Sequence, residues 1–204
     1  LGWGELKRQV ASVAGALRAM GVKPGDRVAS YMPNIPETVV AFFACASIGA
    51  VWSSCSPDMG HRSVVDRFRQ IEPKVLLAVD GYRYGGKDFD RRPQIQQIRD
   101  ALPSLEKVVL LPYLDQTVEM PGTVLWSALL DAAPIDAPAD LPFDHPLWIV
   151  YSSGTTGMPK PIVHGHGGAL IEMLKSHTLH LDLRPDDRFM WFSTTGWIMW
   201  NSQI

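Results

Sequence analysis

One segment of the chain, residues 148–160, constrains the fold more than any other. The segment begins within an apolar run, Leu147 to Val150, which is typical of a buried strand. Glycines and hydroxyl side chains follow at once, and the segment ends at Lys160. Glycines let several backbone N–H groups face one anion, hydroxyls add donors, and a lysine adds a positive charge. The segment therefore predicts a strand that leads into a phosphate-holding loop.

The order of residues in this loop differs from that of the common P-loop. The Gly-x-x-x-x-Gly-Lys-Ser/Thr order is absent, and no hydroxyl follows Lys160 to hold magnesium. Pro159 stiffens the approach to the lysine and donates no hydrogen bond. A polar turn between two strands, with a surface lysine, is the alternative interpretation. The residues expected to contact a nucleotide are Ser152, Ser153, Gly154, Thr155, Thr156, Gly157 and Lys160.

Strand and helix patterns alternate along the chain with short connections between them. In residues 3–20, for example, apolar side chains recur every three or four positions, which indicates an amphipathic helix. Such alternation favours an α/β fold with largely parallel sheets flanked by helices. Helices are expected at residues 3–20, 36–48, 61–71, 93–102 and 168–180. Strands are expected at residues 27–32, 50–53, 74–79, 107–111, 147–150, 162–163 and 188–192.

The segment from Tyr113 to Asp144 is richer in proline and acidic residues and is expected to be a surface excursion with one short helix near Trp126. It could link two domains, but hydrophobic strands follow it immediately, so one domain over residues 1–204 is favoured. The chain opens at Leu1 without a methionine and stops at Ile204 as an apolar helical pattern begins. We therefore expect part of a larger domain, truncated at both ends.

Two segments are expected to share a ligand site. In open parallel sheets, ligands bind beyond the carboxyl ends of the strands. The loop after Val150 and residues 193–196, which follow the expected strand at 188–192, both lie at such ends. Gly196 permits a tight turn there. The neighbouring apolar residues Trp197 to Trp200 could equally be plain core, as apolar stripes usually are.

The remaining composition excludes several classes of protein. Hydrophobic residues make up 46% and charged residues 20%, which excludes wholesale disorder. The net charge is -2 and no basic block is present, so neither nucleic acid nor an anionic membrane is an expected partner. The longest apolar run, residues 39–46, is too short to span a bilayer. The only two cysteines, Cys45 and Cys55, are expected to be buried thiols of a cytoplasmic protein.

Two further groups of residues suggest binding but are expected to be structural. His164 and His166 could both point to one face of a strand, yet no other ligand lies nearby in sequence, so hydrogen bonding is favoured over a metal site. The serines around Cys55 have no identifiable general base, and the charged run at residues 87–92 is typical of solvated surface. No metal-binding residue is predicted.

The loop resembles the signature of the adenylate-forming superfamily, which contains acyl-CoA synthetases, luciferases and the adenylation domains of peptide synthetases. That signature reads Ser/Thr-Ser/Thr-Gly-Ser/Thr-Thr-Gly-x-Pro-Lys and is usually followed by glycine. Pro161 replaces this glycine here, at a position that varies in the acetoacetyl-CoA synthetase branch. Other stretches resemble the same branch. They are residues 22–27, 48–58, 81–87, 164–168 and 195–201.

The resemblance implies the large N-terminal domain of the adenylate-forming fold, with the small C-terminal domain outside this chain. It implies ATP with Mg²⁺ and CoA as co-substrates, and acetoacetate as the acid that is activated. Thr155, Thr156 and Lys160 would be catalytic, since this loop holds the β- and γ-phosphates while the acid attacks the α-phosphorus. Trp197, with Ile198 and Met199, would line the acid pocket. Alternatives are an acetate- or propionate-activating synthetase, or a non-catalytic nucleotide-binding fragment.

Overall fold

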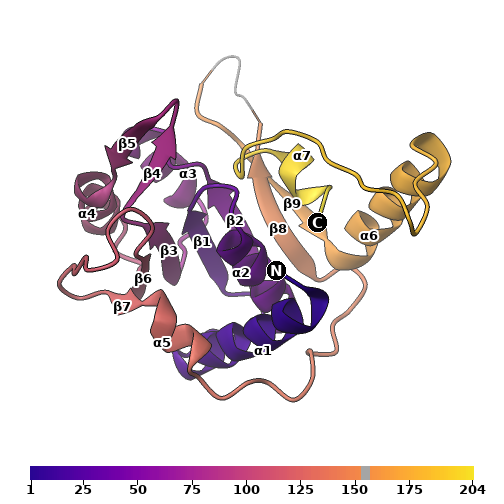
Figure 1. The fold of residues 1–204 in the computed structure, drawn as a ribbon, viewed down its shortest axis with the longest axis horizontal. Helices are drawn as coiled ribbons and strands as arrows, with labels where there is room; N and C mark the ends of the chain where they lie inside the picture. Colours follow the sequence, from indigo (N-terminus) through magenta and orange to yellow (C-terminus); the bar gives the residue numbers. More distant parts are fainter. Residues whose placement is uncertain (153–156) are drawn as a thin grey trace.

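The chain folds around a seven-stranded sheet with the strand order β7-β6-β3-β1-β2-β8-β9 (Figure 1). The computed structural model describes residues 1–152 and 157–204. Every neighbouring pair of strands is parallel except β8 and β9, which are antiparallel. The predicted α/β class with a largely parallel sheet is confirmed.

The sheet consists of β1 (Arg27–Tyr31), β2 (Val51–Cys55), β3 (Val75–Val79), β6 (Lys107–Leu111), β7 (Val124–Leu125), β8 (Pro146–Tyr151) and β9 (Pro161–Gly165). The helices are α1 (Trp3–Ala19), α2 (Pro36–Ser47), α3 (His61–Phe68), α4 (Arg92–Ala101), α5 (Trp126–Leu130), α6 (His166–Lys175) and α7 (Ile198–Asn201), with a π-helical turn, η1, at Ser176–His180. A separate hairpin pairs β4 (Gly81–Tyr84) with β5 (Lys87–Asp90). None of the helices in these described ranges is long and apolar enough to cross a membrane.

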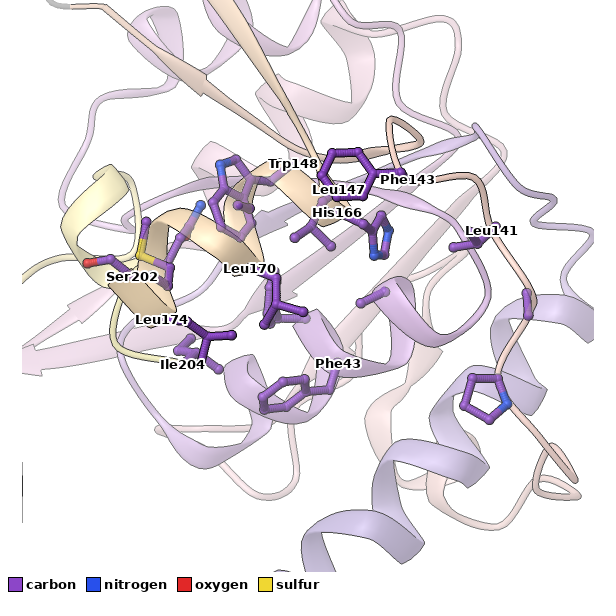
Figure 2. A pocket seen from close by; sticks show the side chains of 18 of the residues that line it. Phe43, Leu141, Phe143, Leu147, Trp148, His166, Leu170, Leu174, Ser202 and Ile204 are labelled. Carbon is purple, nitrogen blue, oxygen red and sulfur yellow. The ribbon is translucent and has the colours of Figure 1, made fainter. Parts of the chain in front are cut away.

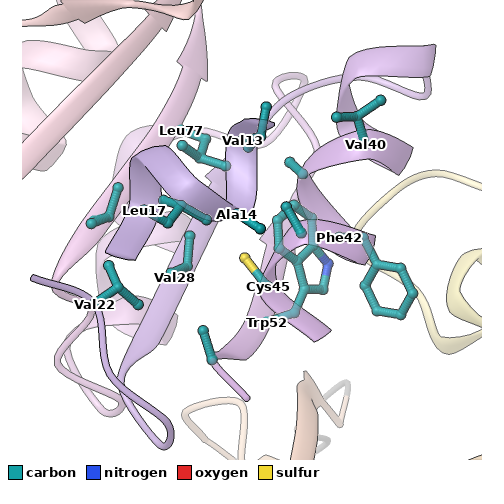
Figure 3. Packing of buried hydrophobic residues seen from close by; sticks show 14 of the residues in the cluster. Val13, Ala14, Leu17, Val22, Val28, Val40, Phe42, Cys45, Trp52 and Leu77 are labelled. Atoms are coloured by element: carbon teal, nitrogen blue, oxygen red, sulfur yellow. The ribbon is translucent and has the colours of Figure 1, made fainter. Parts of the chain in front are cut away.

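Helices cover the two faces of the sheet and bury a core on each. On one face α1, α2 and α5 pack together, and Figure 3 shows Leu17 and Phe42 of this layer near Val28 and Trp52 of the sheet. On the other face α3 and α4 pack over a second cluster. Successive strand residues point to opposite faces. Both sides of the central strands are therefore buried, which explains their near-continuous apolar sequences.

The side of the sheet taken by each connecting helix changes between β1 and β2. Strand β1 is followed by α2, which lies in the first core, whereas β2 is followed by α3, which lies in the second. Pro36 at the start of α2 has the fixed φ that suits a first helical position. Neighbouring connections that leave in opposite directions open a crevice at the carboxyl ends of the two strands. The order of strands and helices alone thus predicts a ligand-binding position at the carboxyl ends of β1 and β2.

The prediction of a strand at residues 188–192 is wrong. The run is apolar enough for a strand, but in the described structure it pairs with no other strand, and the Trp191 N–H instead donates to Gln203 Oε1 at 2.8 Å. Hydrophobicity indicates a strand only when a neighbour supplies the hydrogen bonds. The β4–β5 hairpin was not predicted, although Gly85 and Gly86 at its turn both have positive φ.

Candidate active site

The predicted phosphate loop begins at the carboxyl end of β8 and returns as β9. Tyr151 and Pro161 form the last pair of the two strands. Beyond this pair the Ser152 N–H donates to the Lys160 carbonyl at 3.1 Å, and the Lys160 N–H donates to Ser152 Oγ at 3.3 Å. The segment does connect two antiparallel strands, as the alternative interpretation held. Its position at the carboxyl end of β8, a strand parallel to β2, is nevertheless where an open α/β sheet binds ligands.

Only part of the predicted phosphate-binding set lies in the described structure. Ser153, Gly154, Thr155 and Thr156 lie outside the described residues. The Lys160 side chain is exposed, and no carboxylate in residues 1–152 or 157–204 forms an ion pair with it. At Gly157, no atom of the other described residues, its chain neighbours aside, lies within 4 Å of the position that a Cβ would take. The described side of the loop therefore presents an open approach and an uncompensated positive charge, which suits an anionic ligand.

The crevice between β1 and β2 is occupied by residues 194–197. The buried Thr195 hydroxyl donates to the carbonyl of Met32, directly after β1, at 2.8 Å. Gly196 lies against the end of β2, where a Cβ would stand 3.6 Å from Ser56 N and 3.7 Å from Ser54 O. Residues 188–192 do not form the strand expected to deliver this segment, yet the segment reaches the predicted edge through these contacts.

A cavity of about 220 Å³ lies where this segment meets the base of the loop. Tyr151 lines it from the end of β8 and Trp197 from the inserted segment. Its other lining residues are Cys55, Ser56, Asp58, Met59, Arg67, Thr194 and Gly196. Because it combines an aromatic wall with hydroxyl, carboxyl and guanidinium groups, this cavity can orient a small polar molecule beside the phosphate loop.

A larger cavity of about 650 Å³ lies elsewhere, between α2, α6 and the segment before β8. Figure 2 shows apolar side chains around it, among them Phe43, Phe143, Leu170 and Leu174. Lys160 and Trp197 do not line it. Its described lining includes polar side chains such as His166 and Asn201 but no lysine or arginine, and charged phosphates are costly to place against largely apolar walls, so its greater size does not make it the nucleotide site.

The two tryptophans of the 195–201 motif have different environments. Trp200 is 2% exposed, stacks on Trp52 with ring centroids 6.5 Å apart, and donates from Nε1 to Asn34 Oδ1 at 2.9 Å. Trp197 is 57% exposed and forms part of the small cavity's wall. The core interpretation of the motif therefore applies to Trp200, whereas the acid-pocket role of Trp197 stays a prediction.

The other two residues predicted for the acid pocket do not line this cavity. Ile198 packs against the first core cluster, and Met199 is 40% exposed. The structure therefore brings Trp197, but neither of its two neighbours, to the base of the phosphate loop.

Burial decides the chemistry of the two thiols. Cys45 and Cys55 are free and buried, as predicted. Burial raises the pKa of Cys55 to about 12, with a smaller opposing effect from Arg67. A thiol is nucleophilic as its thiolate, so Cys55 is inert near neutral pH. Burial likewise raises the pKa of the Tyr151 hydroxyl, which stays protonated and can donate a hydrogen bond.

Several cavity residues were missed from the sequence. Ser56 and Tyr151 directly follow or end parallel strands, so the strand-end rule could have found them. Arg67 projects from α3, and its guanidinium lies 5.8 Å from the centre of the Tyr151 ring. No sequence signal distinguishes it from the other arginines around α3.

The two histidines after the loop pack against rings. His164 lies on Trp148 with ring centroids 5.8 Å apart, and His166 lies on His145 at the same separation. The buried His166 Nε2 has no hydrogen-bond partner in the described structure, so the predicted hydrogen-bonding role is wrong for this atom. In the described residues no group of three or more His, Cys, Asp or Glu side chains could hold a metal.

The chain matches the family described as AMP-binding enzyme over residues 1–202. It is 46% identical over 207 residues to acetoacetyl-CoA synthetase of Gallus gallus and 45% identical over 208 residues to acetoacetyl-coenzyme A synthetase of Rhizobium meliloti. These matches cover 97% and 98% of this chain but only 31% and 32% of the relatives. The chain thus spans about a third of the length of the curated relatives it matches.

A solved structure agrees with these matches. Acetoacetyl-CoA synthetase from Streptomyces lividans superposes with a TM-score of 0.94 and 56% sequence identity, over 98% of this chain and 31% of that one. With a family match over almost the whole chain and a strand-end loop of the expected residue types, the chain belongs to the AMP-binding enzyme family.

Proposed function

We propose that the full-length protein is an acetoacetate–CoA ligase. One carboxylate oxygen of acetoacetate attacks the α-phosphorus of ATP, and pyrophosphate leaves as acetoacetyl-adenylate forms. The sulfur of CoA then attacks the acyl carbon, and AMP leaves as the thioester forms. The observation that carries the proposal is the 56% identity, over 98% of this chain, to acetoacetyl-CoA synthetase from Streptomyces lividans.

In this proposal the phosphate loop stabilises the departing pyrophosphate. Thr155, Thr156 and Lys160 contact the β- and γ-phosphates, and Ser152, Ser153, Gly154 and Gly157 complete the loop around them. The exposed ammonium of Lys160, which forms no ion pair with a residue that the structure describes, supports this role. A fixed positive group lowers the barrier most where negative charge develops. Here that charge develops on the leaving oxygen as its bond to the α-phosphorus breaks.

Mg²⁺ enters the proposed reaction together with ATP. This cation is commonly held by substrate phosphates, water and one or two carboxylates. In the described structure, Asp58 is the carboxylate on the wall of the small cavity. ATP phosphates, and not a protein cluster, are therefore the proposed carriers of the metal.

Trp197 is the proposed contact for the acid. Its indole forms one wall of the small cavity, and Trp200 anchors the short helix that begins directly after Trp197 in the core. A flat apolar wall excludes water from the acyl group, while the carboxylate faces the phosphate loop. Ile198 and Met199 remain proposed neighbours of the acid. We also propose a cytoplasmic location, since free thiols are typical of that compartment.

Pyrophosphate exchange into ATP by the full-length protein tests this proposal. Acetoacetate, acetate and propionate are run side by side, with CoA left out. We expect acetoacetate to support exchange with the highest kcat/KM of the three. A higher value for acetate or propionate would instead indicate another short-chain acyl-CoA synthetase. No exchange with any of the acids would indicate a nucleotide-binding protein without this activity.

A further inference from the structure

We propose that Gln70 is a positioning residue that fixes the backbone of Lys160, so that the turn after α3 sets the geometry of the phosphate loop. This inference rests on the proposed role of Lys160. Gln70 is remote from the loop in sequence, 89 residues before Pro159, and is exposed on the surface. Its hydrogen-bond acceptors among the described residues are backbone carbonyls, which the proposed reaction does not change.

The side-chain amide of Gln70 joins α3 to the loop through two hydrogen bonds. Its Nε2 donates to the carbonyl of Asp66 at 2.8 Å and to the carbonyl of Pro159 at 2.9 Å. A glutamine amide has two N–H groups, so both are used. The bond to Asp66 holds the side chain against the end of α3, and the bond to Pro159 extends that support to the residue before Lys160.

The peptide unit between Pro159 and Lys160 is therefore held at both polar groups. Its carbonyl accepts from Gln70, and its N–H donates to Ser152 Oγ at 3.3 Å. The Lys160 carbonyl in turn accepts from the Ser152 N–H at 3.1 Å. Three hydrogen bonds thus orient the backbone around Lys160 while its side chain stays exposed. A charged side chain stabilises a transition state most when the backbone that carries it is already held in position.

The other arm of the loop is held by the same part of α3. The Tyr151 hydroxyl donates to the carbonyl of Arg67 at 2.9 Å, and the Arg67 guanidinium lies over the Tyr151 ring. Tyr151 and Pro159 lie on opposite sides of the loop. The last turn of α3 therefore binds one arm and the turn after it binds the other, which fixes the separation of the two arms as well as their direction.

Helix α3 is a rigid support for this purpose. Val64, Val65 and Phe68 are buried in the second core cluster, and α3 packs against α4. A site supported by a packed helix is held more precisely than one supported by other loops. Displacement of a reacting group by about 1 Å can slow a reaction by as much as about a hundredfold.

The test replaces Gln70 in the full-length protein and measures pyrophosphate exchange with acetoacetate. Gln70→Glu keeps the shape of the side chain but removes both donors, and Gln70→Ala removes the side chain. We expect each to lower the exchange kcat by roughly three- to tenfold, the range for one lost hydrogen bond. The matched control is Gln116→Glu, because Gln116 also donates to a proline carbonyl, that of Pro112, at 2.8 Å on the surface. We expect this control to exchange at the parent rate.

A double-mutant cycle with Lys160→Ala separates positioning from general stability. If Gln70 acts through Lys160, then Gln70→Ala has little further effect once Lys160 is alanine. The inference would be overturned if the fold-loss in kcat of the double variant equalled the product of the two single losses. A parent-like kcat in both Gln70 variants would also overturn it. If one Gln70 variant does not fold, the other completes the cycle, and Tyr151→Phe supplies a second cycle through the opposite arm. A normal rate in Lys160→Ala alone would contradict the proposed role of Lys160, and the inference with it.

Discussion

The two sides of the phosphate loop differ in how well their apolar side chains are covered. Residues 1–151 fill both faces of the sheet, and the central strands β1, β2 and β3 are almost wholly buried. Residues 161–204 contribute few buried side chains to that core, chiefly Ala169 and Trp200. The large apolar side chains that they expose include Leu170, Ile171, Leu174, Leu179, Met190, Trp191 and Phe192.

The comparison separates the scaffold of the site, residues 1–151, from the segment that completes it, residues 161–204. We call the first the closed region and the second the open region. The closed region provides the crevice between β1 and β2, the start of the loop and the support from α3. The open region provides strand β9, which directly follows Lys160, and the inserted residues 194–197, which are anchored by Thr195 and Trp200. Continuous exposed apolar surface in a globular protein marks an interface. We therefore expect the open region to need further protein against it.

The strongest prediction from this contrast is that the 204-residue chain does not catalyse the overall reaction alone. Its relatives are about three times as long, and the apolar face of α6 and of residues 189–192 is uncovered. AMP formation with acetoacetate, Mg-ATP and CoA, compared between this chain and the full-length protein, measures this. Turnover by the short chain close to that of the full-length protein would show that the open region needs no cover.

The next largest effect is expected for Lys160, where the two regions join. Lys160→Ala should slow adenylate formation by roughly a hundredfold to a thousandfold, the cost typical of removing one preorganised stabilising group. Single-turnover rates in the full-length protein check this. Lys175→Ala is a suitable control, because Lys175 is also exposed but pairs with Glu172 on α6. Equal rates for the two variants would remove Lys160 from the mechanism.

Much of the closed region could be predicted from its sequence, and in the open region so could β9 and α6, whereas residues 188–192 could not. Buried parallel strands such as β6, predicted and found at residues 107–111, consist of apolar residues whose environment is apolar on both sides. Residues 188–192 are as apolar, but their local pattern carries no information about a missing partner strand. Trp197 and Trp200 likewise look alike in sequence, and only the tertiary contact to Trp52 distinguishes them.

The support from α3 was beyond prediction for a related reason. The motif identified Lys160 because phosphate binding demands a particular set of residue types in one short stretch. Gln70 needs only to donate one hydrogen bond to a carbonyl 89 residues away. Many surface side chains could do this, so the sequence gives no sign of the one that does.

The two tryptophans sharpen the comparison, because Trp200 is buried in the core whereas Trp197 is exposed. Trp200→Ala should lower the free energy of unfolding by about 3–5 kcal/mol, as expected for a large buried aromatic side chain. Trp197→Ala should change it much less, since that indole is 57% exposed. Denaturant unfolding of both full-length variants measures the difference. Similar losses would mean that Trp197 is a core residue too.

Trp197→Ala should act instead on the acid. We expect kcat/KM for acetoacetate to fall by at least about tenfold, the scale of losing apolar contact in a substrate pocket. The KM for ATP should stay near the parent value, because the phosphate loop is unchanged. Steady-state exchange kinetics with each substrate varied in turn give both quantities. Equal losses for acetoacetate and ATP would contradict a specific contact with the acid.

The smallest expected effect concerns pH and the start of α6. Burial, and then the neighbouring charge of His145, lowers the pKa of His166 below its usual value. The folded state therefore binds this proton less readily than the unfolded state. Stability is fully present above about pH 6.5, the unfolded value, and falls as the pH drops through the folded pKa. His166→Gln should flatten this loss when Tm is compared at about pH 7.5 and 5.5. An unchanged slope would show that His166 does not cause it.

The central proposal is that the full-length protein is a two-step ligase whose phosphate loop lies in this chain. Product analysis of the full-length protein with acetoacetate and Mg-ATP, but without CoA, tests it most directly. We predict rapid release of one pyrophosphate per active site together with enzyme-bound acetoacetyl-adenylate, followed by AMP and the thioester once CoA is added. Release of ADP and phosphate, or no release of pyrophosphate until CoA is present, would contradict the claim.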